Sequence, residues 1–94
     1  MFDRLEQICM LDGTSGDENR VRDFIRANIS ADEVTIDNLG NLIVFKKGRK
    51  TPKNKVMLSA HMDEVGFIVT YICDNGFLKF TNVGGVDSKV VCGR

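Results

Sequence analysis

The stretch from Val56 to Gly66 reads VMLSAHMDEVG and decides most of what the sequence says about the fold. Its first five residues, Val56–Ala60, are almost wholly apolar, which is typical of a strand covered on both faces by helices. A polar and charged segment that begins with His61 follows at once. In open α/β sheets, ligand crevices form at the carboxyl ends of the strands. The stretch therefore predicts a layered protein with His61 at the end of a buried strand.

Downstream of this stretch, the sequence predicts a β-hairpin. Residues 65–72 and 77–83 have the composition of strands, and Asp74-Asn75-Gly76 lies between them. The Asn-Gly pair favours a two-residue hairpin turn, because both central residues of such a turn take positive φ. A loop is expected at residues 84–88, and Val90-Val91-Cys92 resembles the start of one more strand.

Upstream, the pattern predicts two amphipathic helices followed by two strands. Apolar residues recur at helical spacing over residues 2–9, and Ser15 with Glu18 forms a capping box that is expected to open a second helix. Strands at residues 34–36 and 42–45 follow. Two N-terminal helices and then a mixed sheet with a hairpin indicate the α/β class, or α+β if the chain is an isolated fragment.

Charge and composition exclude several kinds of partner. The 94 residues contain 13 basic and 13 acidic side chains, so no excess positive field is present to hold nucleic acid. No apolar stretch approaches the ~20 residues needed to cross a membrane. The three cysteines are far apart and suit free thiols in a reducing compartment, so we expect a cytoplasmic protein.

The candidate chemistry centres on His61, the single histidine of the chain. Asp63 lies two residues on, and residues two apart on an extended chain point to the same side. A carboxylate that accepts the N–H of one ring nitrogen leaves the other nitrogen free for a metal. His61 is thus a candidate metal ligand and Asp63 the group that orients it. The competing interpretation is a histidine that binds no metal and is either exposed at the surface or hydrogen-bonded within the core. A zinc site takes about four ligands, and one histidine cannot make such a site alone.

Two other arrangements fit the sequence less well. The adjacent carboxylates Asp63 and Glu64 point to opposite faces of an extended chain, whereas glycosidase carboxylates converge across a gap of ~5–9 Å. Glu64 is therefore interpreted as a structural partner. Three thiolates from Cys9, Cys73 and Cys92 have a spacing that matches no zinc knuckle.

Four stretches, taken in order, carry a resemblance to a known family. The chain resembles the N-terminal portion of the dinuclear metallo-aminopeptidases, which include glutamyl, deblocking and tetrahedral aminopeptidases and members labelled cellulase or endoglucanase. The likeness covers nearly all of the chain. The four stretches are Ser15–Arg22, Asp37–Leu42, Ala60–Gly66 and Gly84–Asp87.

The resemblance implies a partial peptidase-domain fold and a partial active site. Residues 1–83 would be the N-terminal part of the catalytic domain, and residues 84–94 the start of an inserted β-rich domain. His61 would ligate one of two divalent metal ions, zinc or cobalt, with Asp63 holding its ring. A metal-activated water would attack the peptide carbonyl, assisted by a general-base glutamate that is not present in this chain. Peptide substrates and a homo-oligomer are also implied.

Two alternatives from other classes remain open. The first is a non-catalytic α+β binding or scaffold module, for which His61 would be dispensable. The second is an endo-1,4-glucanase, which rests on the labelling of family members alone.

The resemblance implies that the 94-residue chain alone is catalytically silent, because the chain supplies one of the five metal ligands expected in the family. We expect titration calorimetry of the isolated chain to show no micromolar zinc site. Micromolar binding that disappears in His61→Ala would contradict this expectation.

Overall fold

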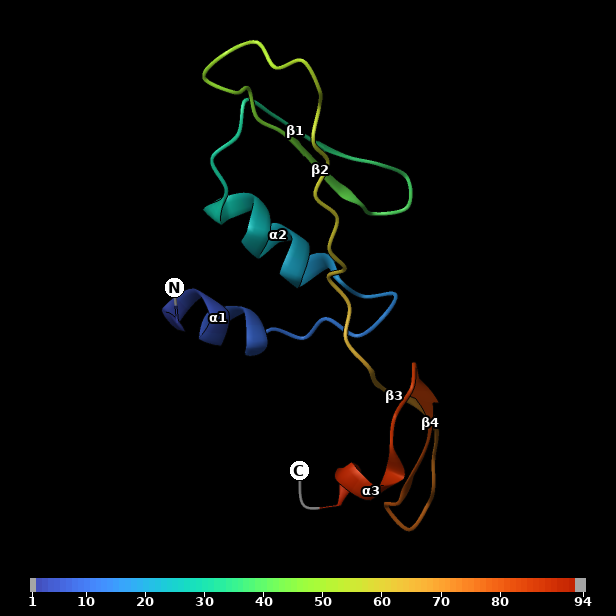
Figure 1. The fold of residues 1–94 in the computed structure, drawn as a ribbon. Helices are drawn as coiled ribbons and strands as arrows, with labels where there is room; N and C mark the ends of the chain where they lie inside the picture. Colours follow the sequence, from blue (N-terminus) through green and yellow to red (C-terminus); the bar gives the residue numbers. More distant parts are fainter. Residues whose placement is uncertain (1, 93–94) are drawn as a thin grey trace.

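A computed structural model describes residues 2–92 and shows an α+β arrangement of helices and hairpins (Figure 1). The strands form two separate antiparallel pairs, β1 with β2 and β3 with β4. The α+β prediction is confirmed, whereas the single mixed sheet is wrong for the described residues. The elements, in order, are α1 (Phe2–Cys9), α2 (Asn19–Asn28), β1 (Glu33–Ile36), β2 (Leu42–Phe45), β3 (Gly66–Ile72), β4 (Leu78–Val83) and α3 (Ser88–Val91).

The first hairpin is closed by one aspartate. β1 and β2 pair in register with Val34 opposite Val44. At the turn, Oδ1 of Asp37 accepts the backbone N–H groups of Leu39 and Asn41, each at 2.9 Å. Its Oδ2 accepts the side-chain amide of Asn41 at 2.8 Å. The carboxylate therefore closes the turn together with the Asp37 carbonyl, which accepts the Gly40 N–H at 3.0 Å.

The second hairpin is present as predicted, but its turn is of a different type. The Cys73 N–H donates to the Phe77 carbonyl at 2.8 Å, so the loop has the three residues Asp74–Gly76. Gly76 has φ of 84°, while Asn75 is not in the positive-φ region. A turn followed by one left-handed glycine is the common three-residue solution, and it needs positive φ at a single position. The predicted two-residue turn is wrong for this reason.

The buried strand predicted at Val56–Ala60 is not formed. The segment is extended coil, and Val56, Met57 and Leu58 are 85%, 89% and 93% exposed. A strand needs a hydrogen-bonded neighbour, and β2 and β3 pair with β1 and β4 instead. In Figure 1 it is part of the long connection, residues 46–65, that leads from β2 to β3.

The helices differ from expectation at two of their ends. α2 begins at Asn19 with Glu18 as its N-cap residue and without a side-chain cap bond, so the predicted Ser15–Glu18 capping box is wrong. The predicted strand at residues 90–92 is also wrong, because Asp87 caps the Lys89 N–H at 2.9 Å and starts α3.

α2, the longest helix described at 10 residues, is too short to cross a membrane, and so are the others described.

The chain is much more open than a compact domain of its size. It exposes 8907 Å², whereas a compact protein of 10.5 kDa exposes roughly 5,400 Å². Its radius of gyration is 18.2 Å, against roughly 12 Å for a compact chain of this length. Among the described residues, Val21 is the single buried hydrophobic side chain, at 7% exposure. The helices and hairpins are therefore formed while most of their apolar faces remain uncovered.

The turn at Asp37 makes the first hairpin sensitive to acid. The Asn41 side-chain amide, followed by the backbone N–H groups of the loop, holds the pKa of Asp37 below its ordinary value of 3.8. A group whose pKa is lowered by folding stabilises the folded form above its unfolded pKa, and this contribution is lost as the pH falls through the folded pKa. We expect a carboxyl ¹³C titration to place Asp37 below 3.8.

Asn41→Ala removes the largest cause of the shift and is expected to move the Asp37 titration back towards its ordinary value. A titration of Asp37 at or above 3.8 in the unsubstituted chain would contradict this account of the turn.

Candidate functional site

The candidate site forms where two segments far apart in the sequence meet. Thr14 and Glu64 make a parallel β-bridge. The Glu64 N–H donates to the Gly13 carbonyl at 2.8 Å, and the Ser15 N–H donates to the Glu64 carbonyl at 3.2 Å. Oε1 of Glu64 accepts the Gly13 N–H at 3.3 Å. Glu64 therefore acts as the structural partner that was predicted, and it fastens the loop before α2 to the segment that carries His61.

This close approach depends on two glycines. A Cβ at Gly13 would lie 2.7 Å from Cγ2 of Val21, the buried side chain of α2. A Cβ at Gly66 would lie 2.7 Å from Oγ1 and 2.8 Å from Cγ2 of Thr14. A larger residue at Gly66 would push the loop away from the segment that it pairs with, and one at Gly13 would push the loop away from α2.

His61 and Asp63 are in contact, as the two-residue spacing predicts. Nδ1 of His61 lies 3.0 Å from Oδ1 of Asp63 and 3.0 Å from its backbone carbonyl oxygen. Both partners are acceptors, so Nδ1 must carry the proton. In the neutral ring the lone pair is then on Nε2, which makes no recorded hydrogen bond within residues 2–92. The side chain is 85% exposed, so Nε2 is accessible.

Ser15 completes the arrangement, and the sequence analysis missed it. Its hydroxyl donates to Oδ2 of Asp63 at 2.5 Å. This bond, followed by the bond from His61, lowers the pKa of Asp63 from its ordinary value and keeps the carboxylate ionised. The sequence assigns Ser15, with Glu18, to a capping box, and the spacing alone gives no signal that connects Ser15 to a residue 48 positions away.

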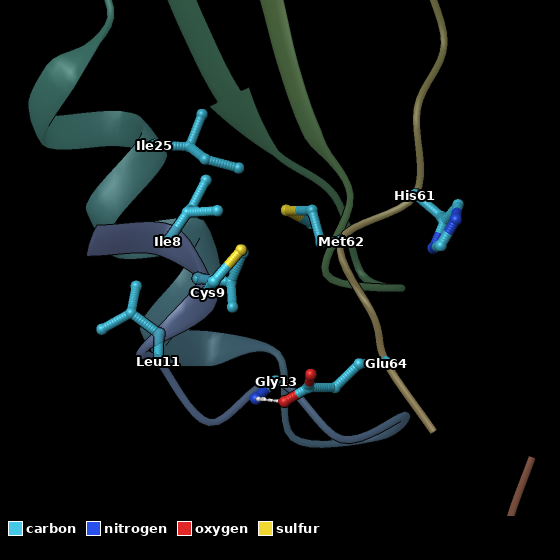
Figure 2. A pocket seen from close by; sticks show the side chains of 9 residues that line it. Ile8, Cys9, Leu11, Gly13, Ile25, His61, Met62 and Glu64 are labelled. Atoms are coloured by element: carbon cyan, nitrogen blue, oxygen red, sulfur yellow. Dashed lines mark hydrogen bonds between the residues drawn. The ribbon is translucent and has the colours of Figure 1, made fainter. Parts of the chain in front are cut away.

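The side chains of Met62 and His61 point in opposite directions. Figure 2 shows the Met62 side chain directed towards α1 and α2, while His61 points away from the helices. Met62 lines a shallow apolar hollow with Ile8, Leu11 and Ile25. Successive side chains of this segment therefore face away from the helices at His61 and towards them at Met62.

The described residues do not form a complete metal site. Within residues 2–92, no three His, Cys, Asp or Glu side chains come together so that they could hold a metal ion. The cysteines Cys9, Cys73 and Cys92 are free thiols. The single donor that is oriented and accessible here is Nε2 of His61, and its ring matches the carboxylate–histidine arrangement that binds metals.

Comparison with known proteins identifies the family. The sequence profile of the M42 glutamyl aminopeptidases matches residues 40–94, a range that contains both His61 and Asp63. The chain belongs to the M42 family. This finding confirms the resemblance on which the sequence interpretation depends.

Individual relatives agree with this assignment. The chain is 49% identical to a putative aminopeptidase of Acetivibrio thermocellus, over 92% of this chain and 26% of that protein. It is 33% identical to the glutamyl aminopeptidase of Lactococcus lactis subsp. cremoris, over 100% of this chain and 27% of that protein. The chain thus spans about a quarter of the length of the curated relatives that it matches.

A solved structure shows the same arrangement of the backbone. The crystal structure of an endoglucanase from Thermotoga maritima superposes with a TM-score of 0.82 at 48% identity. The match covers 92% of this chain and 28% of that chain. The open arrangement of this M42 chain is therefore also that of the corresponding part of a longer protein.

The contact of Gly66 with Thr14 gives a testable consequence. In the complete protein, Gly66→Ala is expected to lower the free energy of unfolding by about 1–3 kcal/mol, because the added methyl overlaps two side-chain atoms of Thr14. Thr14→Ala in the same background removes those two atoms and should recover part of the loss, which a double-mutant cycle from denaturant unfolding measures. Additive effects of the two substitutions would contradict this contact.

Proposed function

We propose that this M42 chain supplies the first metal ligand of a metal-dependent aminopeptidase that releases N-terminal residues from peptides. The observation that carries the proposal is the oriented ring of His61, whose Nδ1–H is held by Asp63 and whose Nε2 is exposed. The family membership and the relatives named as aminopeptidases support the same activity.

The donor set fits a divalent cation. A neutral imidazole suits zinc and cobalt among the first-row metals, and a carboxylate on the opposite ring nitrogen raises its basicity. We propose two such ions, with His61 contributing to one of them and the remaining ligands and the general-base glutamate lying outside the described residues. When bound, the ions would activate a water and polarise the scissile carbonyl.

The residues of this chain contribute orientation and support. Asp63 fixes the tautomer of His61, Ser15 and Glu64 hold the segment on which both lie, and the side chain of Met62 faces the helices from that segment. We propose residues 1–83 as the N-terminal part of the catalytic domain and residues 84–94 as the start of an inserted domain.

The uncovered apolar faces support a further part of the proposal. Side chains such as Val56, Met57 and Leu58 are more than four-fifths exposed, and such surface favours association. We propose that the remainder of a longer chain covers these faces and that the complete protein is a homo-oligomer. A cytoplasmic location is proposed from the three free cysteines.

The test uses the complete protein that carries this chain. After removal of metals by a chelator, we expect no hydrolysis of aminoacyl p-nitroanilides, and recovery when zinc or cobalt is added. His61→Ala is expected to lower kcat/KM by more than about 100-fold, since removing only the hydrogen-bond partner of a metal ligand already costs ~10–100-fold. Lys53→Ala, in an exposed loop, serves as the control and should retain full activity.

Retention of peptide hydrolysis by His61→Ala would contradict the proposal and favour a module in which His61 is dispensable. Hydrolysis of carboxymethylcellulose without peptide hydrolysis would favour an endoglucanase instead. The geometry gives that activity no support, because the Asp63 carboxylate is engaged by Ser15 and His61 while Glu64 bonds to Gly13.

A further inference from the structure

We propose that Ser15 is a positioning residue, whose hydroxyl fixes the Asp63 carboxylate and thereby holds the His61 ring with Nε2 presented to a cation. The inference rests on the proposed function, because a bound cation is what the oriented ring would serve. It concerns a residue that lies 48 positions before Asp63 and on a different segment.

The first argument is the division of the carboxylate oxygens. Oδ1 of Asp63 accepts the Nδ1–H of His61 at 3.0 Å, and Oδ2 accepts the Ser15 hydroxyl at 2.5 Å. With a different partner on each oxygen, the carboxylate cannot rotate about its terminal torsion without breaking a bond. Without Ser15, the single bond to His61 would leave that torsion broad, as it ordinarily is for aspartate.

The second argument is that Ser15 itself is held in place by the segment that carries Asp63. The Ser15 N–H donates to the Glu64 carbonyl at 3.2 Å, and the preceding residue pairs with Glu64 in the parallel bridge. The Glu64 carboxylate holds Gly13, two residues before Ser15. The hydroxyl therefore reaches Asp63 from a backbone position that is set by the same strand-like pairing.

The third argument is that no competing role accounts for this hydroxyl. A serine three residues before a glutamate ordinarily caps a helix, but α2 has Glu18 as its N-cap residue and no side-chain cap bond. The Glu18 carboxylate accepts the Gly16 N–H at 2.7 Å instead. Apart from a long approach to the Glu64 carbonyl at 3.4 Å, the Ser15 hydroxyl bonds to Asp63.

The experiment compares two substitutions of nearly equal shape in the complete protein. Ser15→Thr keeps the hydroxyl, and Ser15→Val replaces it with a methyl group. Zinc affinity is measured by competition with a chromophoric chelator, so the readout does not require activity. We expect Ser15→Thr to bind zinc as the unsubstituted protein does, and Ser15→Val to bind about 3–10-fold more weakly, below the ~10–100-fold cost of removing the direct partner of a ligand.

A second readout reports on the ring in the metal-free protein. Long-range ¹H–¹⁵N spectra, with His61 assigned by its loss in His61→Ala, distinguish a ring protonated at Nδ1 from a mixture of tautomers. At a pH where the ring is neutral, we expect the Nδ1–H tautomer in the unsubstituted protein and in Ser15→Thr. In Ser15→Val the shifts should move towards the average of both tautomers.

Matched behaviour of Ser15→Thr and Ser15→Val, in zinc affinity and in the tautomer spectra, would overturn the proposal. If Ser15→Val does not fold, Ser15→Ala takes its place in the same comparison with Ser15→Thr. Ser30→Ala removes the hydroxyl of an exposed serine outside the site and should change neither readout. If the proposed function is wrong, the unsubstituted protein will bind no zinc. The tautomer spectra of the metal-free protein still test the role of Ser15 in that case.

Discussion

The pairing of residues 13–15 with residues 63–64 is the constraint on which the site depends. Closing a loop of 51 residues costs roughly 3–4 kcal/mol of chain entropy, and the few backbone hydrogen bonds of the pairing contribute about 1 kcal/mol each. These hydrogen bonds therefore do not offset the cost of closing the loop by themselves. The close approach of Gly13 to Val21 and of Gly66 to Thr14 adds packing at the same junction.

The parts of the fold that the sequence predicts correctly are those decided by local interactions. α1 and both hairpins follow from residues close in the chain, and the Asn-Gly pair locates the second turn although its type differs. The Val56–Ala60 strand fails because a strand is completed by a neighbour, and apolar character alone does not provide one. Residues 90–92 fail because the Asp87 cap outweighs a run of three strand-forming residues.

The candidate site likewise has one contact that local spacing predicts and one that it does not. The contact between His61 and Asp63 follows from the period of an extended chain, so it could be predicted without a fold. Ser15 could not be found in this manner, because a local rule for helix caps explained the same residue and its actual partner is 48 residues away. The profile of the M42 family matches residues 40–94, which include His61 and Asp63, whereas Ser15 lies before that range.

The separation of Ser15 from Asp63 also has a consequence in time. During synthesis at ~5–20 residues per second, roughly 2–10 s pass between the emergence of the serine and the addition of the aspartate 48 residues later. Over that interval α1 and α2, of 8 and 10 residues, lack the segment that pairs with the loop between them, and isolated helices of this length are only marginally stable in water. The ring of His61 therefore takes its orientation only after both ends of the pairing have left the ribosome.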